Sequence, residues 1–139
     1  MASDSRTHHE PCPCGRPHAL AECCGPYLTG ARPAPDPESL MRSRYTAFAL
    51  GTAEAIEYLV ATQHPDHREA NLREGLRASI AGIDAWERLR VLSAEIDGER
   101  GIVEFVATYR VGTKRGQLHE RSEFERERGH WLYTRGAIR

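Results

Sequence analysis

The sequence predicts an α+β fold in which three helices precede a four-stranded antiparallel sheet, with a small metal-binding segment at the N-terminal end. Apolar residues recur at helical spacing between Asp36 and Asp84, and then at every second position up to Ile138. All four cysteines lie within residues 12–24. Helices and strands segregated in this way are typical of helices packed on one face of an antiparallel sheet.

Composition narrows the class of protein. The chain has 139 residues, of which 40% are apolar and 28% charged, and this fits one modest domain with a small appendage. The formal charge of −1 disfavours a dedicated nucleic-acid binder, which carries a basic surplus. We find neither a secretory signal nor the roughly 18 continuous apolar residues that span a bilayer. We therefore expect a cytoplasmic protein with reduced thiols and no membrane partner.

The chain divides into four segments. We interpret residues 1–10 as a flexible tail and residues 11–27, which hold every cysteine, as a metal-binding knuckle. Residues 28–37 include the stretch GARPAPDP and predict a semi-extended linker, because proline fixes φ and disfavours a helix before it. Residues 38–139 form the predicted α+β domain.

The first two helices are predicted from their capping residues. Asp36 followed by Pro37 is a good helix start, and this helix should end near Leu50 because Gly51 follows. Thr52 can cap a second, shorter helix that ends before residues 64–65.

A third helix is predicted from Asp66 onward, because Glu69 three residues later completes a capping box. Its apolar stripe is Leu72, Leu76, Ile80 and Ile83.

Four strands follow, separated by turns at residues 97–98, 112–116 and 129. Alternation places several residues of each strand on one face. In the first three strands these are Leu92, Ala94 and Ile96; Val103, Phe105, Ala107, Tyr109 and Val111; and Leu118, Glu120, Ser122 and Phe124. The last strand runs from Trp131 to Ile138.

The cysteine pattern C-P-C, eight residues, then C-C predicts a zinc site formed by Cys12, Cys14, Cys23 and Cys24. Four thiolates this close can surround a tetrahedral ion. So short a segment buries no core of its own, and a metal has to hold it together. Disulfides and iron remain as alternatives, although adjacent cysteines pair only with strain.

The stretch from Cys12 to Gly25 resembles the SEC-C motif, the zinc-binding tail known from the protein-export ATPase SecA. It departs from the usual Ser-Gly-Lys after Gly15, where this chain has Arg16-Pro17-His18. Because the SecA tail contacts a chaperone and is associated with ribosomes, the resemblance implies that the knuckle docks onto another protein.

The rest of the chain is similar to the bacterial YchJ family. The similarity rests on LMRSRYTAFALG from Leu40, on Thr62 and His64-Pro65, on Glu120-x-Ser-x-Phe124 and on Trp131-x-Tyr133. It implies a nuclear-transport-factor-two-like domain, a cone of curved sheet closed by helices. Domains of this type often dimerise through the open sheet face, so a homodimer is compatible with it.

Glu120 and Ser122 share a strand face with Leu118 and Phe124, which should look into the interior. A buried carboxylate needs a partner, and the first helix offers Arg42, Arg44 and the Tyr45 hydroxyl. We hypothesise a pair with one of the two arginines and favour Arg44. The candidate pocket residues are Glu120, Arg44, Tyr45, Tyr109, Ser122 and His64.

Two functions follow from these patterns. The first is zinc-dependent protein docking through the knuckle, since four thiolates leave zinc no open position for catalysis. The second is a small-molecule-binding or isomerase-like pocket in the cone, with Glu120 as carboxylate anchor or base. We find no nucleophile–base pair and no cofactor-binding loop in the sequence that would indicate an enzyme. A filled cone would favour docking, whereas an open cavity lined by Glu120, Tyr45 and Tyr109 would favour a ligand.

Overall fold

The structure, a computed structural model, describes residues 10–139; the predicted tail falls almost entirely outside them. The predicted α+β order is confirmed. The knuckle region contains a 3-10 turn, η1 (Leu20–Glu22), and a short helix, α2 (Gly25–Leu28). The main elements are α3 (Pro37–Leu50), α4 (Ala53–Ala61), the 3-10 turn η2 (Pro65–His67), α5 (Leu72–Ala81), β1 (Ala85–Asp97), β2 (Arg100–Val111), β3 (Lys114–Glu127) and β4 (His130–Ile138).

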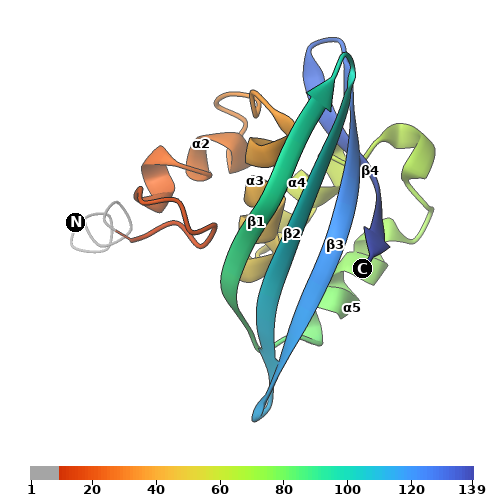
Figure 1. Ribbon diagram of the computed structural model, residues 1–139. Coiled ribbons are helices and arrows are strands. Elements are labelled where there is room, and N and C mark those ends of the chain that lie inside the picture. Colours follow the sequence, from red (N-terminus) through yellow and green to blue (C-terminus); the bar gives the residue numbers. More distant parts are fainter. Residues whose placement is uncertain (1–9) are drawn as a thin grey trace.

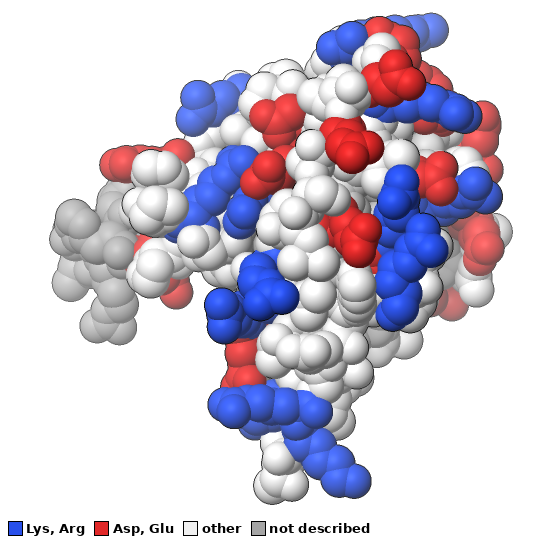
Figure 2. Space-filling model, in the orientation of Figure 1, with Lys and Arg blue, Asp and Glu red and all other residues white. Residues whose placement is uncertain are grey.

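The four strands form one antiparallel meander in the order β1-β2-β3-β4. The sheet is strongly twisted, and α3, α4 and α5 lie against one of its faces (Figure 1). In the same orientation, which has the sheet in front of the helices, acidic and basic side chains intermingle over the exposed strands (Figure 2). A sheet that buries one face and leaves the other to solvent explains the alternation of the strand sequences.

The first two helices begin and end as predicted. The Asp36 carboxylate accepts the backbone N–H of Ser39 at 2.7 Å, and Gly51 ends α3 in the left-handed conformation with φ 63°. The hydroxyl of Thr52 accepts the backbone N–H of Ala55 at 3.1 Å at the start of α4. These local capping bonds are readable from sequence because they join residues three apart.

The predicted start of the third helix at Asp66 is wrong. The backbone N–H of Asp66 donates to Nδ1 of His64 instead, and residues 65–67 form the turn η2. The helix itself, α5, begins only at Leu72, after Asn71, which makes no side-chain capping bond. The imidazole of His64 thus accepts the Asp66 N–H that the Glu69 side chain would have accepted in a capping box.

The predicted inner face of the first strand also needs correction. The register between β1 and β2 shifts between Val91 and Ser93, so Leu92 lies at a β-bulge. Leu92 and Ile96 are exposed, and it is Leu89 that is buried, with Val91 partly buried against the core. The extra residue of the bulge shifts the alternation by one position, so Leu89 and Val91, which precede the bulge, do not belong to the alternation predicted from Leu92 onward.

The knuckle packs into the main core. The four cysteines belong to the same buried cluster as Leu40 and Tyr45 of α3, Leu89 of β1 and Phe105 of β2. A second, smaller cluster, centred on Leu59, joins α4 to α5. The metal-binding segment and the cone therefore share one interior.

Candidate metal centre and cavity

The cysteine cluster fits one tetrahedral metal ion. The sulfur atoms of Cys12, Cys14, Cys23 and Cys24 all lie within 4.8 Å of one another. Those of Cys14 and Cys23 are 3.7 Å apart, close to the ~3.8 Å edge of a tetrahedron with metal–sulfur bonds of ~2.3 Å. None of the four cysteines is in a disulfide, and all are buried. The four cysteines thus form a metal-binding cluster, and the disulfide alternative is not realised in this structure.

The electrostatics of the cluster also favour a cation. Burial, together with the negative charge of Cys12 and Cys14, raises the pKa of Cys23 to about 12. Hydrogen bonds from the Cys14 and Cys24 thiols hold the pKa of Cys12 far below its ordinary value. The neighbouring sulfurs thus shift the pKa values of Cys12 and Cys23 in opposite directions. A divalent cation removes this conflict, because it allows all four to be thiolates at once.

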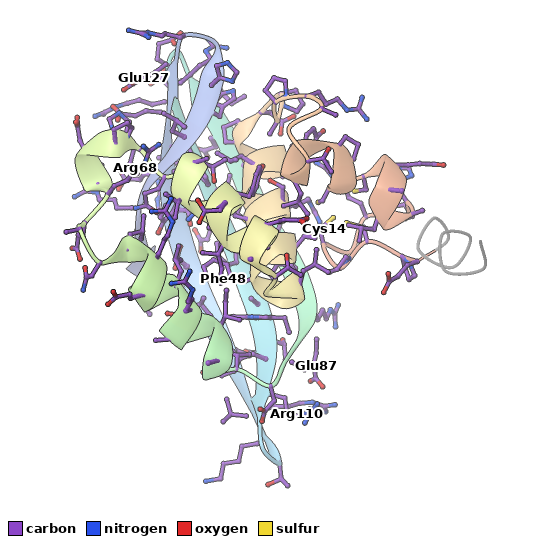
Figure 3. The ribbon with its side chains drawn as sticks, turned by 180° about the vertical axis from the view of Figure 1, so that it is seen from behind. Cys14, Phe48, Arg68, Glu87, Arg110 and Glu127 are labelled. Atoms are coloured by element: carbon purple, nitrogen blue, oxygen red, sulfur yellow. The ribbon has the colours of Figure 1, made fainter. Side chains whose placement is uncertain are left out.

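Helix α3 holds the knuckle in place through one side-chain stripe. The Arg42 guanidinium donates to the carbonyl oxygen of Cys14 at 2.7 Å and to the Glu38 carboxylate at 2.9 Å. One turn further along, the Thr46 hydroxyl lies 3.7 Å from the sulfur of Cys12. Viewed from the helix side, Cys14 sits at the junction of the knuckle and α3 (Figure 3).

The other side of α3 faces a cavity of about 540 Å³ that lies between the helices and the concave sheet and is open at one end. Its walls are mostly apolar and aromatic. Tyr45, Trp86 and Tyr109 form a chain of edge-to-face rings with centroids 5.8 and 5.5 Å apart. Five of the six predicted pocket residues line the cavity: Arg44, Tyr45, Tyr109, Glu120 and Ser122. Whether they bind a ligand remains a prediction.

The predicted ion pair between Glu120 and Arg44 is absent from the structure, which describes residues 10–139. The Arg44 guanidinium donates to the carbonyl oxygen of Leu59 at 2.8 Å, to the Thr62 hydroxyl at 2.7 Å and to the Gln63 side chain at 3.3 Å. It also lies over the Tyr133 ring, 4.5 Å from the centroid. Burial lowers the pKa of Arg44 to about 10, so it remains charged at neutral pH.

Glu120 has no ion-pair partner among the residues that the structure describes, and it lines the cavity. It accepts the Ser122 hydroxyl at 2.6 Å. The nearby Tyr133 has its pKa raised to about 12, first by burial and then by the negative charge of Glu120. The polar end of the cavity thus combines an acceptor, Glu120, with a donor, the Tyr133 hydroxyl, at the end of aromatic walls.

His64 does not line the cavity. Its Nε2 approaches Glu127 at hydrogen-bonding range and lies 3.5 Å from Glu125, and these three side chains form a second cluster of possible metal ligands. Nδ1 of His64 accepts the N–H of Asp66, so the ring proton is on Nε2, where it donates to Glu127. A metal-binding histidine needs the opposite arrangement. His64 is a structural link between α4 and the β3–β4 hairpin, and Figure 3 shows Glu127 far from Cys14.

Sequence reasoning missed three residues at these two sites. Tyr133 was noticed only as part of a family pattern, and nothing in the strand alternation marked it as the neighbour of both Glu120 and Arg44. Arg42 and Thr46 lie four residues apart on α3, the spacing of one helix face. That spacing was a readable signal, although it did not reveal what the stripe contacts.

Comparisons with known proteins agree with this architecture. The family model described as "YchJ, middle NTF2-like domain" matches residues 36–136. A UPF0225 protein from Chromobacterium violaceum is 46% identical over 91% of this chain and 92% of its own length. The solution structure of a SEC-C motif containing protein from Rhodopseudomonas palustris is 40% identical, with a TM-score of 0.83 over 91% of this chain and 96% of that one. The crystal structure of a SEC-C motif containing protein from Psychrobacter arcticus is 25% identical, with a TM-score of 0.75 over 92% of this chain and 82% of that one.

Fold and site together define the class, a four-cysteine SEC-C centre built onto an NTF2-like domain. The chain belongs to the YchJ-like family, represented among its curated relatives by the UPF0225 proteins. Across residues 10–139, every helix is too short or too polar to cross a bilayer.

Proposed function

We propose that this protein binds a small, largely apolar molecule in the cone of its NTF2-like domain, and that zinc in the knuckle stabilises the fold around it. The observation that carries the proposal is the cavity itself. Its volume of about 540 Å³ falls within the usual range of small-molecule sites, and a few polar groups converge at one end. Its lining includes Glu120, Tyr45 and Tyr109, which supports a ligand-binding role over a docking role.

The lining defines the class of ligand. The rings of Tyr45, Trp86 and Tyr109 offer faces and edges to a flat apolar or aromatic body. At the polar end, the Glu120 carboxylate has further lone pairs with which to accept a hydrogen bond from a ligand, and the Tyr133 hydroxyl, which interacts with Glu120, can turn to donate to one. Because Arg44 and Glu120 together are neutral, a net charge on the ligand gains little. We therefore expect an uncharged molecule whose polar head carries both a donor and an acceptor, such as a hydroxyl or an amide.

Filling the cavity tests this proposal. Ala107 is buried in the middle of β2 and lines the cavity, so Ala107→Phe places a ring where the ligand would lie. We expect Nile red, a neutral apolar dye, to bind the native protein with a fluorescence increase and to bind this variant at least about tenfold more weakly, equivalent to about 1.4 kcal/mol.

The matched control is Ala137→Phe, which adds the same ring at an exposed position on β4. If the two variants bind the dye equally well, or if the native protein does not bind it, the cone is not a ligand site. Leu118→Trp fills the cavity from β3 and serves as a second variant should Ala107→Phe fold poorly.

Zinc is the metal that best fits the centre. Four thiolates in tetrahedral reach are the ligands of structural zinc sites, and they leave no open position for substrate or water. The cytoplasmic location that we expect from the sequence, where thiols remain reduced, would favour the same assignment. Iron has the same donor set available to it and is the alternative outcome of a metal analysis.

Docking through the knuckle is the second candidate, and one observation favours it. The metal ligands are buried, whereas Pro17 and His18, in the loop between the two cysteine pairs, are exposed. A partner could therefore contact this loop without disturbing the metal. The partner chemistry suggested by resemblance is a chaperone or the ribosome.

The loop offers a cleaner test of docking than the cysteines, whose loss would disturb the core. Pro17→Ala combined with His18→Ala should leave the melting temperature unchanged and abolish co-purification of ribosomes or of a chaperone with the tagged protein. Equal recovery of such a partner with the native and the substituted loop would count against docking through it.

A further inference from the structure

The main domain supplies part of the metal centre's surroundings. We propose that Thr46 of α3 donates a hydrogen bond to the metal-bound sulfur of Cys12 and thereby positions that ligand and strengthens metal retention. The inference rests on the metal binding proposed above. It makes Thr46 a positioning residue for a centre whose four ligands all come from elsewhere in the chain.

The surroundings of the Thr46 hydroxyl carry the argument. Thr46 is 0% exposed, and its Oγ1 lies 3.7 Å from the Cys12 sulfur. A threonine inside a helix usually donates to the carbonyl oxygen of the preceding turn. Among the side-chain contacts of residues 10–139, however, the partners of the Thr46 hydroxyl are cysteine sulfurs: that of Cys12 at 3.7 Å, and also that of Cys24. A buried hydroxyl aimed at sulfur rather than at its own helix indicates a specific contact.

The chemistry of the bound state fixes the direction of this bond. A sulfur that ligates a metal is a thiolate, which has no proton and can only accept. Thr46 must therefore donate when the metal is present. Second-layer donors of this kind hold ligands in position, and their loss typically costs 10- to 100-fold in metal affinity.

The net charge of the metal centre explains why the hydrogen bond from Thr46 should strengthen metal binding. Four thiolates around one divalent cation carry a net charge of about −2, and all four sulfurs are buried. Burying such a charge is costly unless donors surround it. Arg42, one turn earlier on the same face of α3, brings a positive charge to the Cys14 carbonyl oxygen. Thr46 and Arg42 together make α3 the electrostatic support of the knuckle.

Thr46→Val tests the proposal because valine keeps the shape of threonine and removes only the donor. We expect the zinc-loaded variant to transfer its metal to the chelator 4-(2-pyridylazo)resorcinol about 10- to 100-fold faster than the native protein. Thr46→Ser retains the hydroxyl and should stay near the native rate. With cobalt in place of zinc, the sulfur-to-metal charge-transfer band should shift in Thr46→Val and not in Thr46→Ser.

Ser43→Ala is the matched control for a merely structural effect. Ser43 is also fully buried on α3, but its hydroxyl bonds to the Leu40 carbonyl oxygen and to the Tyr58 hydroxyl and not to a cysteine sulfur. It should lower the melting temperature and leave zinc transfer and the cobalt spectrum unchanged. The proposal is overturned if Thr46→Val, or Thr46→Ala should valine not fold, behaves like Ser43→Ala. A native protein that binds neither metal would overturn the metal centre itself, which is a separate and recognisable outcome.

Discussion

Replacing Cys14 by serine is expected to unfold the whole domain and not only the knuckle. Cys14 is 0% exposed and belongs to the same core as Tyr45 of α3 and Phe105 of β2. Losing this ligand removes metal binding, which is worth on the order of 10 kcal/mol in small zinc domains, and leaves a polar gap in the main core. Since domains of this size are stable by only about 5–15 kcal/mol, little cooperative structure should remain.

The measurement is thermal unfolding followed by near-ultraviolet circular dichroism, which reports on the packing of Trp86 and Trp131. We expect a decrease in melting temperature of at least about 15 °C, or no transition at all. Treating the native protein with excess chelator should produce the same loss. His18→Ala, an exposed change in the same segment, is the control and should leave the transition in place. A Cys14→Ser protein that keeps the native tryptophan signal would mean that the knuckle is merely tethered to the domain.

Arg44→Met is expected to be the second most damaging change. Removing the guanidinium leaves the Leu59 carbonyl oxygen and the Thr62 hydroxyl without their donor, and it leaves Glu120 without a compensating charge nearby. Truncating one member of a buried charged network costs about 3–5 kcal/mol. Lysine should not restore stability, because one ammonium cannot reach three acceptors and also stack on the Tyr133 ring.

Urea unfolding of Arg44→Met, Arg44→Lys and Arg73→Met separates this effect from a loss of general charge. Arg73 forms an exposed ion pair with Glu57 across α4 and α5, and its loss should hardly move the midpoint. If Arg44→Met and Arg73→Met shift the midpoint equally, the Arg44 network does not stabilise the domain.

The parts of the fold that sequence could predict are those set by neighbouring residues. The caps of α3 and α4 join positions three apart, and the inner face of β3 follows from strict alternation at Leu118, Glu120, Ser122 and Phe124. The four-cysteine cluster was equally accessible, because its spacing confines the sulfurs to a small volume.

The errors came from contacts between residues far apart in the chain. The start of α5 moved because His64, whose own N–H donates to the Tyr133 carbonyl oxygen on β4, captures the N–H of Asp66. The Arg44 partner was predicted from charge alone, whereas the structure offers it the end of α4 and the Tyr133 ring. Likewise, the Gly- and Pro-rich linker gave no indication that the knuckle packs against α3, where Arg42 and Thr46 contact it.

The contacts of Arg42 and Thr46 with the knuckle connect the metal centre to the cavity through α3. Because α3 contacts the cysteine cluster on one side and lines the cavity on the other, the metal centre and the cone share this helix as a common wall. Metal binding then stabilises the same helix that presents Arg44 and Tyr45 to the cavity.

The metal content of the purified protein tests the four-cysteine zinc centre most directly. Protein purified from cells without added metal, and analysed by inductively coupled plasma mass spectrometry together with its native mass, should contain one zinc ion per chain with all four cysteines reduced. Purified protein that contains no metal while remaining folded, or whose mass shows the cysteines joined in disulfides, would contradict it.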